Sequence, residues 1–256
     1  MSVVHIRDLS YTYGGTQPIT ALQNIELEIG DNEFVSLIGP SGCGKSTLLR
    51  LVADLLAPVR GSVQIDGAPA ATARRQRTIG FVFQEPALMP WRTSAANVRL
   101  PLEVMRATRR RGSVVSDLLR LVGLQDFGDK RPDQLSGGMR QRVSIARSLT
   151  YDPHVLLMDE PFGALDQITR DEMNEELLTV WEQKRSTVLF VTHSIAEAIY
   201  LSDRVVVLSA RPGRIVDVVP VPLERPRTGT MKRCREFIET ESRVLAGLEG
   251  RVMADG

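Results

Sequence analysis

The sequence predicts an α/β protein: a parallel sheet covered by helices, with an antiparallel sheet at its edge and an inserted helical region. Short apolar runs at 34–38, 155–158 and 187–191 have the composition of strands buried on both faces. Helical spacing follows these runs, which is the order of a parallel sheet. Between 93 and 150 the strand signals vanish and helical periodicity takes over, which predicts the insertion.

Length and composition limit the classes of function. A chain of 256 residues with 43% hydrophobic and 25% charged residues can bury one large core, alone or with an inserted subdomain. The net charge of +1 gives no electrostatic argument for binding nucleic acid or anionic lipid. The two cysteines lie far apart, and no run approaches the ~20 apolar residues of a membrane span. With no signal peptide at the first residues, we expect a cytosolic protein that reaches a membrane only through a partner.

A glycine-rich stretch follows the first buried run and leads into an amphipathic helix, the setting in which G-x-x-x-x-G-K-[ST] binds phosphate. The residues of this phosphate loop are Gly39, Pro40, Ser41, Gly42, Cys43, Gly44, Lys45, Ser46 and Thr47. Glycines let backbone N–H groups face an anion, Lys45 can reach the β- and γ-phosphates, and Ser46 can ligate Mg²⁺. A turn with an accidental Lys-Ser pair would lack the strand and helix around it. Apolar spacing predicts that the helix runs through Leu55 and ends at Pro58.

The N-terminal segment predicts two strands, 3–9 and 22–29, around a Gly14-Gly15 turn. Tyr13 before that turn is either a strand-end aromatic or a flat ring that stacks on a nucleobase. Two further strands are expected at 62–67 and 78–84. Gln84 would then end a strand at the edge where ligands bind, in contact with a metal or an attacking water, unless it is a surface amide.

The helical region predicts helices at 98–105, 114–122 and 139–149, and we interpret the basic run 109–111 as a solvated face. The last of these helices opens with Ser136-Gly137-Gly138. A hydroxyl before a glycine-rich helix start is either a second anion site or a simple N-cap.

Two acids, Asp159 and Glu160, close the second apolar run at the ligand-binding edge. Neighbouring carboxylates need a compensating cation, so Asp159 fits a Mg²⁺ ligand and Glu160 a general base. His193 follows the third run, and the pattern from Ser194 to Glu197 predicts a helix that starts directly after it. A catalytic or γ-phosphate-sensing role for His193 and a structural one both stay open.

The C-terminal third predicts a helix over 168–183 and a hairpin, 204–210 with 215–221, around a type II turn at Pro212-Gly213. An apolar helical stripe follows in a short tail. We therefore predict a core over 1–90 and 151–224, a helical subdomain over 91–150 and a helical tail over 225–256.

Taken together, the motifs resemble an ABC transporter ATP-binding subunit over roughly residues 3–222. The resemblance implies a RecA-like P-loop NTPase core and two subunits that dimerise head to tail around two ATP molecules. It implies that Tyr13 stacks on adenine, that Gln84 links Mg²⁺ and water to the membrane contact, and that Glu160 is the general base. The other implied nucleotide contacts are His193 to the γ-phosphate, Ser136, Gly137 and Gly138 to ATP on the other subunit, and Asp166 across the dimer.

Two segments, 84–91 and 209–215, resemble more narrowly the nitrate, sulfonate and taurine importer ATPases, and the bicarbonate and pyrimidine-precursor importers look similar. Met139 stands where Gln is commoner in the family, a substitution seen in this subgroup. The resemblance implies ATP and Mg²⁺ as cofactors and a homodimer on two membrane permease subunits at the cytoplasmic face, with a solute-binding protein as indirect partner and no nucleic acid. The alternatives are a soluble ABC ATPase acting on ribosomes or DNA, and a scaffold that binds ATP without turnover.

Overall fold

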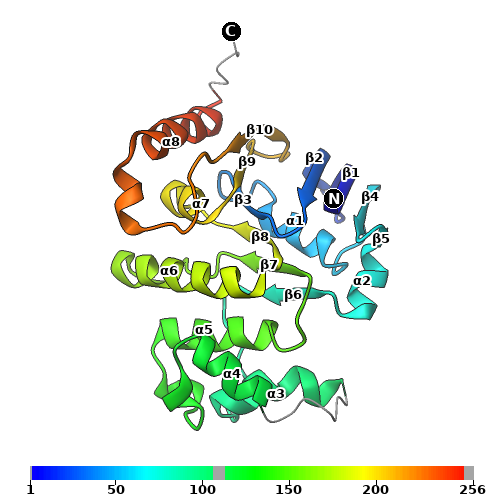
Figure 1. The fold of residues 1–256 in the computed structure, drawn as a ribbon. Helices are drawn as coiled ribbons and strands as arrows, with labels where there is room; N and C mark the ends of the chain where they lie inside the picture. Colours follow the sequence, from blue (N-terminus) through cyan, green and yellow to red (C-terminus); the bar gives the residue numbers. More distant parts are fainter. Residues whose placement is uncertain (1, 106–112, 251–256) are drawn as a thin grey trace. The chain divides into compact units, whose positions relative to one another are not determined.

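The computed structural model describes residues 2–105 and 113–250, so the basic run 109–111 lies outside the described residues (Figure 1). The chain forms two compact units: Met1–Gln76 together with Ser186–Gly256, and Arg77–Arg185. We describe each unit by itself. The predicted division at residues 90 and 150 stays a prediction, and the second unit contains two strands as well as helices.

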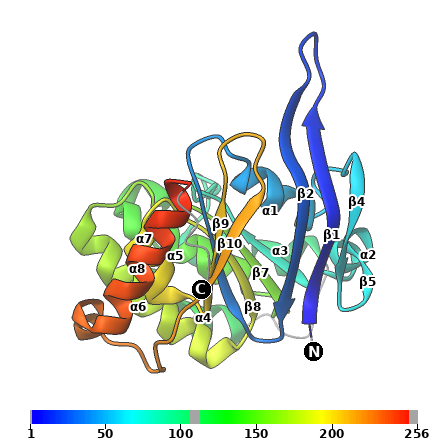
Figure 2. The same cartoon turned by 90° about the horizontal axis from the view of Figure 1, so that it is seen from above.

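The first unit contains an antiparallel sheet in the order β2-β1-β4-β5. Its strands are β1 Ser2–Tyr13, β2 Ile19–Gly30, β4 Arg60–Ile65 and β5 Ala68–Pro69. The long β1–β2 hairpin is the upright pair in Figure 2 and extends beyond the predicted ranges. In β2, Ile25, Leu27 and Ile29 are buried and alternate with exposed residues, as a sheet with one covered face requires.

The same unit contains three parallel strands in the order β8-β3-β9, followed by antiparallel β10. These are β3 Phe34–Ile38, β8 Thr187–Val191, β9 Arg204–Leu208 and β10 Ile215–Pro220. Every residue of β3 and β8 is buried, which is why both appear in the sequence as unbroken apolar runs.

Three helices of the first unit are α1 Lys45–Val52, α2 Ala70–Gln76 and α7 Ile195–Leu201, and α2 was not predicted. The predicted end of α1 near Pro58 is wrong. Asp54 adopts a left-handed conformation with φ 55°, and the Leu55 N–H donates to the Arg50 carbonyl at 2.8 Å. These contacts close the helix before Leu55, and the side chain of Leu55 is exposed.

The predicted type II turn at Pro212-Gly213 is also wrong, because Gly213 lacks the positive φ that such a turn needs. The Gly213 N–H instead donates to the Ala21 carbonyl at 2.9 Å, and the Gln23 N–H donates to the Gly213 carbonyl at 3.0 Å. The hairpin between β9 and β10 is present, but its connection is bonded to β2.

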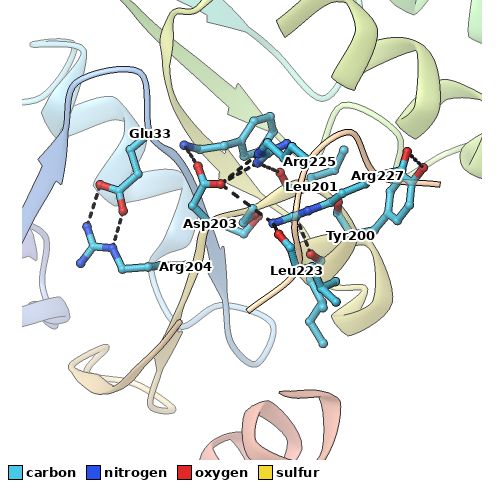
Figure 3. Close-up of polar contacts among 12 residues, drawn as sticks. Glu33, Tyr200, Leu201, Asp203, Arg204, Leu223, Arg225 and Arg227 are labelled. Atoms are coloured by element: carbon cyan, nitrogen blue, oxygen red, sulfur yellow. Dashed lines mark hydrogen bonds and ion pairs between the residues drawn. The ribbon is translucent and has the colours of Figure 1, made fainter. Parts of the chain in front are cut away.

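The C-terminal segment of the first unit contains half-buried Arg225 and buried Arg227, the 3₁₀ turn η3 Gly229–Arg233 and the helix α8 Arg235–Leu248. Arg225 pairs with Asp203 (Figure 3), and its Nη2 lies 2.8 Å from the carboxylate. The Arg227 guanidinium donates to the carbonyls of Ile199 and Tyr200, each at 2.9 Å. Burial, and then the charge of Arg225, lower the pKa of Arg227 to about 10. The two arginines therefore cap the end of α7, where carbonyls lack helical partners.

The second unit pairs two parallel strands, β6 Ile79–Val82 and β7 Val155–Asp159, with a set of helices. The helices are α3 Ser94–Val104, α4 Ser113–Leu121, α5 Gly137–Ser148 and α6 Gln167–Lys184, with the 3₁₀ turns η1 Gln125–Phe127 and η2 Pro132–Gln134. The predicted strand 78–84 is too long at its end: β6 stops at Val82, so Gln84 lies in the following loop. Among the described residues, none of the helices has the length and apolar character to span a membrane.

Candidate functional site

The phosphate loop connects buried β3 to α1 in the first unit, as predicted. Gly44 is the N-cap of α1 and has φ 107°, and no side chain caps the helix. A Cβ at Gly44 would come within 2.7 Å of Leu22, so only glycine fits this position. The first-turn N–H groups of α1 lack helical acceptors, and an anion is the partner that such a helix start favours.

Lys45 folds back across the loop. Its ammonium donates to the carbonyls of Gly39 at 2.8 Å and Pro40 at 3.2 Å, and the residue is only 6% exposed. Cys43 is fully buried beneath the loop, and burial raises the pKa of its thiol. The Lys45 ammonium is therefore fixed beside the backbone N–H groups of the loop. The Cys43 thiol stays neutral because its pKa is raised.

Tyr13 lies beside the start of α1. Its hydroxyl and the hydroxyl of Thr47 are 2.9 Å apart, and Tyr11 packs edge-on against its ring with centroids 4.9 Å apart. Tyr13 as a whole residue is 39% exposed. The structure therefore brings a partly exposed flat ring to the phosphate loop, and stacking of this ring on a nucleobase stays a prediction.

His193 lies at the same sheet edge as the phosphate loop. In the β3–β8 register Leu37 pairs with Val191, so Gly39 and His193 each stand two residues beyond the paired positions. His193 is exposed, and Ser194 caps α7 by accepting from the Glu197 N–H at 3.3 Å. The pattern from Ser194 to Glu197 is that of a capping box, in which the Glu197 carboxylate would accept from the Ser194 N–H. In the structure this carboxylate accepts from the Thr192 hydroxyl instead.

Gln84, Asp159 and Glu160 share one edge of the β6–β7 pair in the second unit. Val82 pairs with Met158, so Gln84 and Glu160 stand at equal offsets beyond the paired residues. Asp159 is buried, and Glu160 is half-buried with a φ of 44°. A glutamate in the left-handed region is an uncommon backbone state that is concentrated at functional sites.

The loop after β6 is held by residues that the sequence analysis missed. Asn97 is fully buried: its amide oxygen accepts from the Met89 N–H at 2.8 Å, and its amide nitrogen donates to the Met89, Arg92 and Thr93 carbonyls. Arg147 donates to the carbonyls of Pro86 and Ala87 at 2.7 and 2.8 Å, and burial lowers its pKa. Arg147 lies about 60 residues from its partners, and Asn97 contacts backbone groups four to eight residues before it, so no motif signals either set of contacts.

Ser136 begins α5, as predicted, and it is exposed. Its hydroxyl accepts from the Met139 N–H at 3.3 Å, so the N-cap interpretation is correct for the isolated chain. Gly138 is buried, and a Cβ there would contact Thr169 at 3.4 Å. The residues Ser136, Gly137 and Gly138 therefore stand next to the segment that begins α6.

Asp166 is the N-cap of α6. Its carboxylate accepts from the Thr169 N–H at 3.0 Å and from the Thr169 hydroxyl at 2.8 Å. These hydrogen bonds lower the pKa of Asp166, so the exposed carboxylate is ionised at neutral pH. A cap of this kind orders the loop 161–166 after Glu160.

Comparison with known proteins identifies the family. A family model described as ABC transporter matches residues 22–163. The nitrate import ATP-binding protein of Synechococcus elongatus is 46% identical, over 82% of this chain and 77% of that protein. The chain belongs to the ABC transporter family. The aliphatic sulfonates import ATP-binding protein of Bacillus cereus is 44% identical, over 91% of this chain and 90% of that protein.

A solved structure of an ATP-binding cassette in a dimeric, post-hydrolysis state with ADP and Pi is also similar. It has a TM-score of 0.75 and 35% identity, over 86% of this chain and all of that one. The α/β fold, with its RecA-like P-loop ATPase core, is therefore confirmed. As an ABC transporter ATP-binding protein, the chain is an ATPase.

Proposed function

We propose that this ATPase powers the import of a small anion or an organosulfur compound. The relatives named for nitrate and aliphatic sulfonates import span most of both chains at 44–46% identity, and this similarity carries the proposal. Both relatives are transporter subunits, which favours transport over the alternative of action on ribosomes or DNA.

ATP would be held mainly by the first unit. The phosphates lie on the N–H groups of residues 42–47 with Lys45 beside them, and Tyr13 stacks on the adenine. His193 contacts the γ-phosphate from the same sheet edge. The support is that the phosphate loop, the exposed Tyr13 ring and the β3–β8 edge belong to one unit.

Mg²⁺ would be held by Ser46, Gln84 and Asp159. Their hydroxyl, amide and carboxylate oxygens are the hard donors that Mg²⁺ prefers, so the residues present fit the ion. When bound, the ion neutralises charge on the β- and γ-phosphates. Glu160 takes the proton of the attacking water, and Gln84 orients that water and links the site to the membrane contact.

A second copy of the chain would complete each site. Ser136, Gly137 and Gly138 stand at an exposed helix start that suits the γ-phosphate of ATP held by the partner, and Asp166 lies on the neighbouring segment. The dimeric state of the similar cassette supports this arrangement. Closure of the dimer then couples hydrolysis to a conformational change.

The dimer would bind two membrane permease subunits at the cytoplasmic face, with a solute-binding protein acting on the far side. In the second unit, Phe83 and Trp91 are 41% and 69% exposed around the Gln84 loop, and such apolar side chains suit a protein contact. No nucleic acid enters this proposal, since the net charge is +1.

The test is reconstitution with the permease and the solute-binding protein encoded beside this chain. We expect ATP-dependent uptake of nitrate or an alkanesulfonate into vesicles, with phosphate release stimulated by the loaded solute-binding protein. Phosphate release without uptake of any solute would contradict the importer proposal. Nucleotide binding without phosphate release would favour a scaffold that binds ATP without turnover. Purification with ribosomes or DNA would favour a soluble ABC ATPase that acts on them.

A further inference from the structure

The loop between β9 and β10, residues 209–214, packs against the phosphate loop. It is ordered by its own contacts: the Ser209 hydroxyl donates to the Pro212 carbonyl and accepts from the Arg214 N–H, each at 3.0 Å. Figure 2 shows this hairpin beside β2 and α1. All of these segments belong to the first unit.

Arg211 contacts the phosphate loop directly. Its Nε and Nη2 atoms donate to the Gly42 carbonyl oxygen at 3.2 and 3.0 Å. Gly42 has φ 75°, and the next N–H, of Cys43, donates to the Pro40 carbonyl at 3.2 Å. The peptide group between Gly42 and Cys43 is therefore held at both ends, its C=O by Arg211 and its N–H by Pro40. This peptide sets the turn with which the phosphate loop begins.

Gly213 also contacts the phosphate loop, at the backbone of Cys43. A Cβ on Gly213 would overlap the Cys43 carbonyl oxygen, so the two backbones touch. Gly213 also bonds to β2 through Ala21 and Gln23, next to Leu22, which pairs with Tyr11. One short loop thus connects the phosphate loop to the hairpin that carries Tyr13.

We infer that Arg211 is a positioning residue for nucleotide binding, which acts by holding the Gly42 carbonyl away from the phosphates. A peptide free to rotate could turn its carbonyl oxygen toward the anion, and this orientation would repel phosphate. Two N–H groups of one guanidinium converge on the Gly42 carbonyl oxygen, and together with the Cys43 N–H bond to Pro40 they restrain rotation of this peptide. The inference rests on the proposed phosphate-binding role of residues 39–47.

The test compares ATP affinity by calorimetry for the full chain and four variants. Arg211→Met keeps the length of the side chain and removes its donors, and we expect the Kd for Mg-ATP to rise about 5- to 10-fold. Arg211→Gln can donate one hydrogen bond to Gly42 and should recover to within about threefold of the wild type. Arg214→Met is the matched control, because Arg214 contacts Gln23 at 2.7 Å and leaves the phosphate loop untouched. Its Kd should stay within about twofold.

Inorganic triphosphate serves as an adenine-free probe in competition with ATP. Arg211→Met should weaken triphosphate and ATP by the same factor, because the effect passes through the phosphate loop. An unchanged Kd for Arg211→Met, or an equal loss in Arg214→Met, overturns the inference. Lys45→Ala distinguishes failure of the proposed phosphate site from failure of the Arg211 inference. If Lys45→Ala also binds ATP with the wild-type Kd, then the phosphate-binding role of residues 39–47 is wrong, and the Arg211 result does not bear on it. Arg211 is exposed, so melting temperatures should match the wild type.

Discussion

The two units hold their functional residues in different ways. In the first unit the candidate groups are fixed by contacts with one another: Lys45 to Gly39, Tyr13 to Thr47, Arg211 to Gly42. In the second unit Ser136 and Asp166 cap the helices that they begin, and the loop that carries Gln84 is held by Asn97 and Arg147. The groups of the first unit therefore hold one another in place, whereas Ser136 and Asp166 hold the starts of their own helices.

The starts of α1 and α5 show this difference most clearly. Both follow glycine-rich segments, but α1 has no side-chain cap, whereas Ser136 caps α5 with its own hydroxyl. An uncapped start leaves its amides for a phosphate, while a capped, exposed start is stable without one. We therefore expect changes in the first unit to alter ATP affinity and changes in the second to alter turnover at constant affinity.

Glu160→Gln should have the largest effect. The amide cannot accept the proton of water, so kcat should fall about 10²- to 10⁴-fold while the Kd for ATP stays within about twofold. Phosphate release and calorimetry on the same sample measure the two quantities. Glu172→Gln, an exposed site in the same unit, is the control and should leave both unchanged. Full turnover by Glu160→Gln would remove this residue as the base.

Lys45→Ala should give the converse result. It removes a charge-assisted contact to phosphate, so the Kd for ATP should rise about 10- to 100-fold. Calorimetry measures the change. If affinity held and only kcat fell, the separation between the units would break down.

Asn97→Ala tests whether the second unit depends on buried positioning residues. The change leaves the Met89 N–H and three carbonyls without the side chain that satisfies them, and we expect a loss of about 1–3 kcal/mol of unfolding free energy. Because the loop that carries Gln84 loses order, kcat should fall, while the Kd for ATP should stay unchanged. Chemical denaturation gives the first quantity, and wild-type stability would contradict the role of Asn97.

Tyr13 gives the smallest effect. Tyr13→Ala should weaken ATP about 5- to 10-fold through lost stacking, and leave inorganic triphosphate unaffected. Tyr13→Phe keeps the ring and loses only the Thr47 contact, so it should stay within about threefold. An equal loss in both variants would assign the effect to the hydroxyl and not to stacking.

Much of the fold could be predicted because buried parallel strands leave unbroken apolar runs: β3 and β8 have the predicted bounds. The ends of helices and the connections between strands were harder to predict. The helix α1 ends at Val52, and the chain turns away at Asp54 in the left-handed conformation that aspartate tolerates, so Pro58 gave a misleading boundary. The connection at Gly213 was misjudged because its geometry is set by hydrogen bonds to β2, a strand distant in sequence.

The places of the candidate residues in the fold were predictable where a motif fixes both residue type and local backbone: Lys45 begins α1, Asp159 ends β7 and Ser136 caps α5. Their roles toward ATP stay predictions. Residues that act through another element were not predictable. Asn97, Arg147 and Arg211 hold loops by side-chain contacts to backbone carbonyls, and a carbonyl carries no sequence signal. Such contacts appear only when the fold brings the segments together.

The central claim is that one copy holds only part of each nucleotide site, and that Ser136 of the partner subunit contributes to the rest. The direct test is the mass of Glu160→Gln with and without Ser136→Asp in saturating Mg-ATP, measured by sedimentation. Aspartate keeps the N-cap of α5 but places a negative charge against the triphosphate. Glu160→Gln should sediment as a dimer, Glu160→Gln/Ser136→Asp as an ATP-bound monomer, and the matched Glu160→Gln/Ser136→Asn as a dimer. A dimer that persists in the aspartate variant, or a Glu160→Gln protein that binds ATP and stays monomeric, would contradict the account.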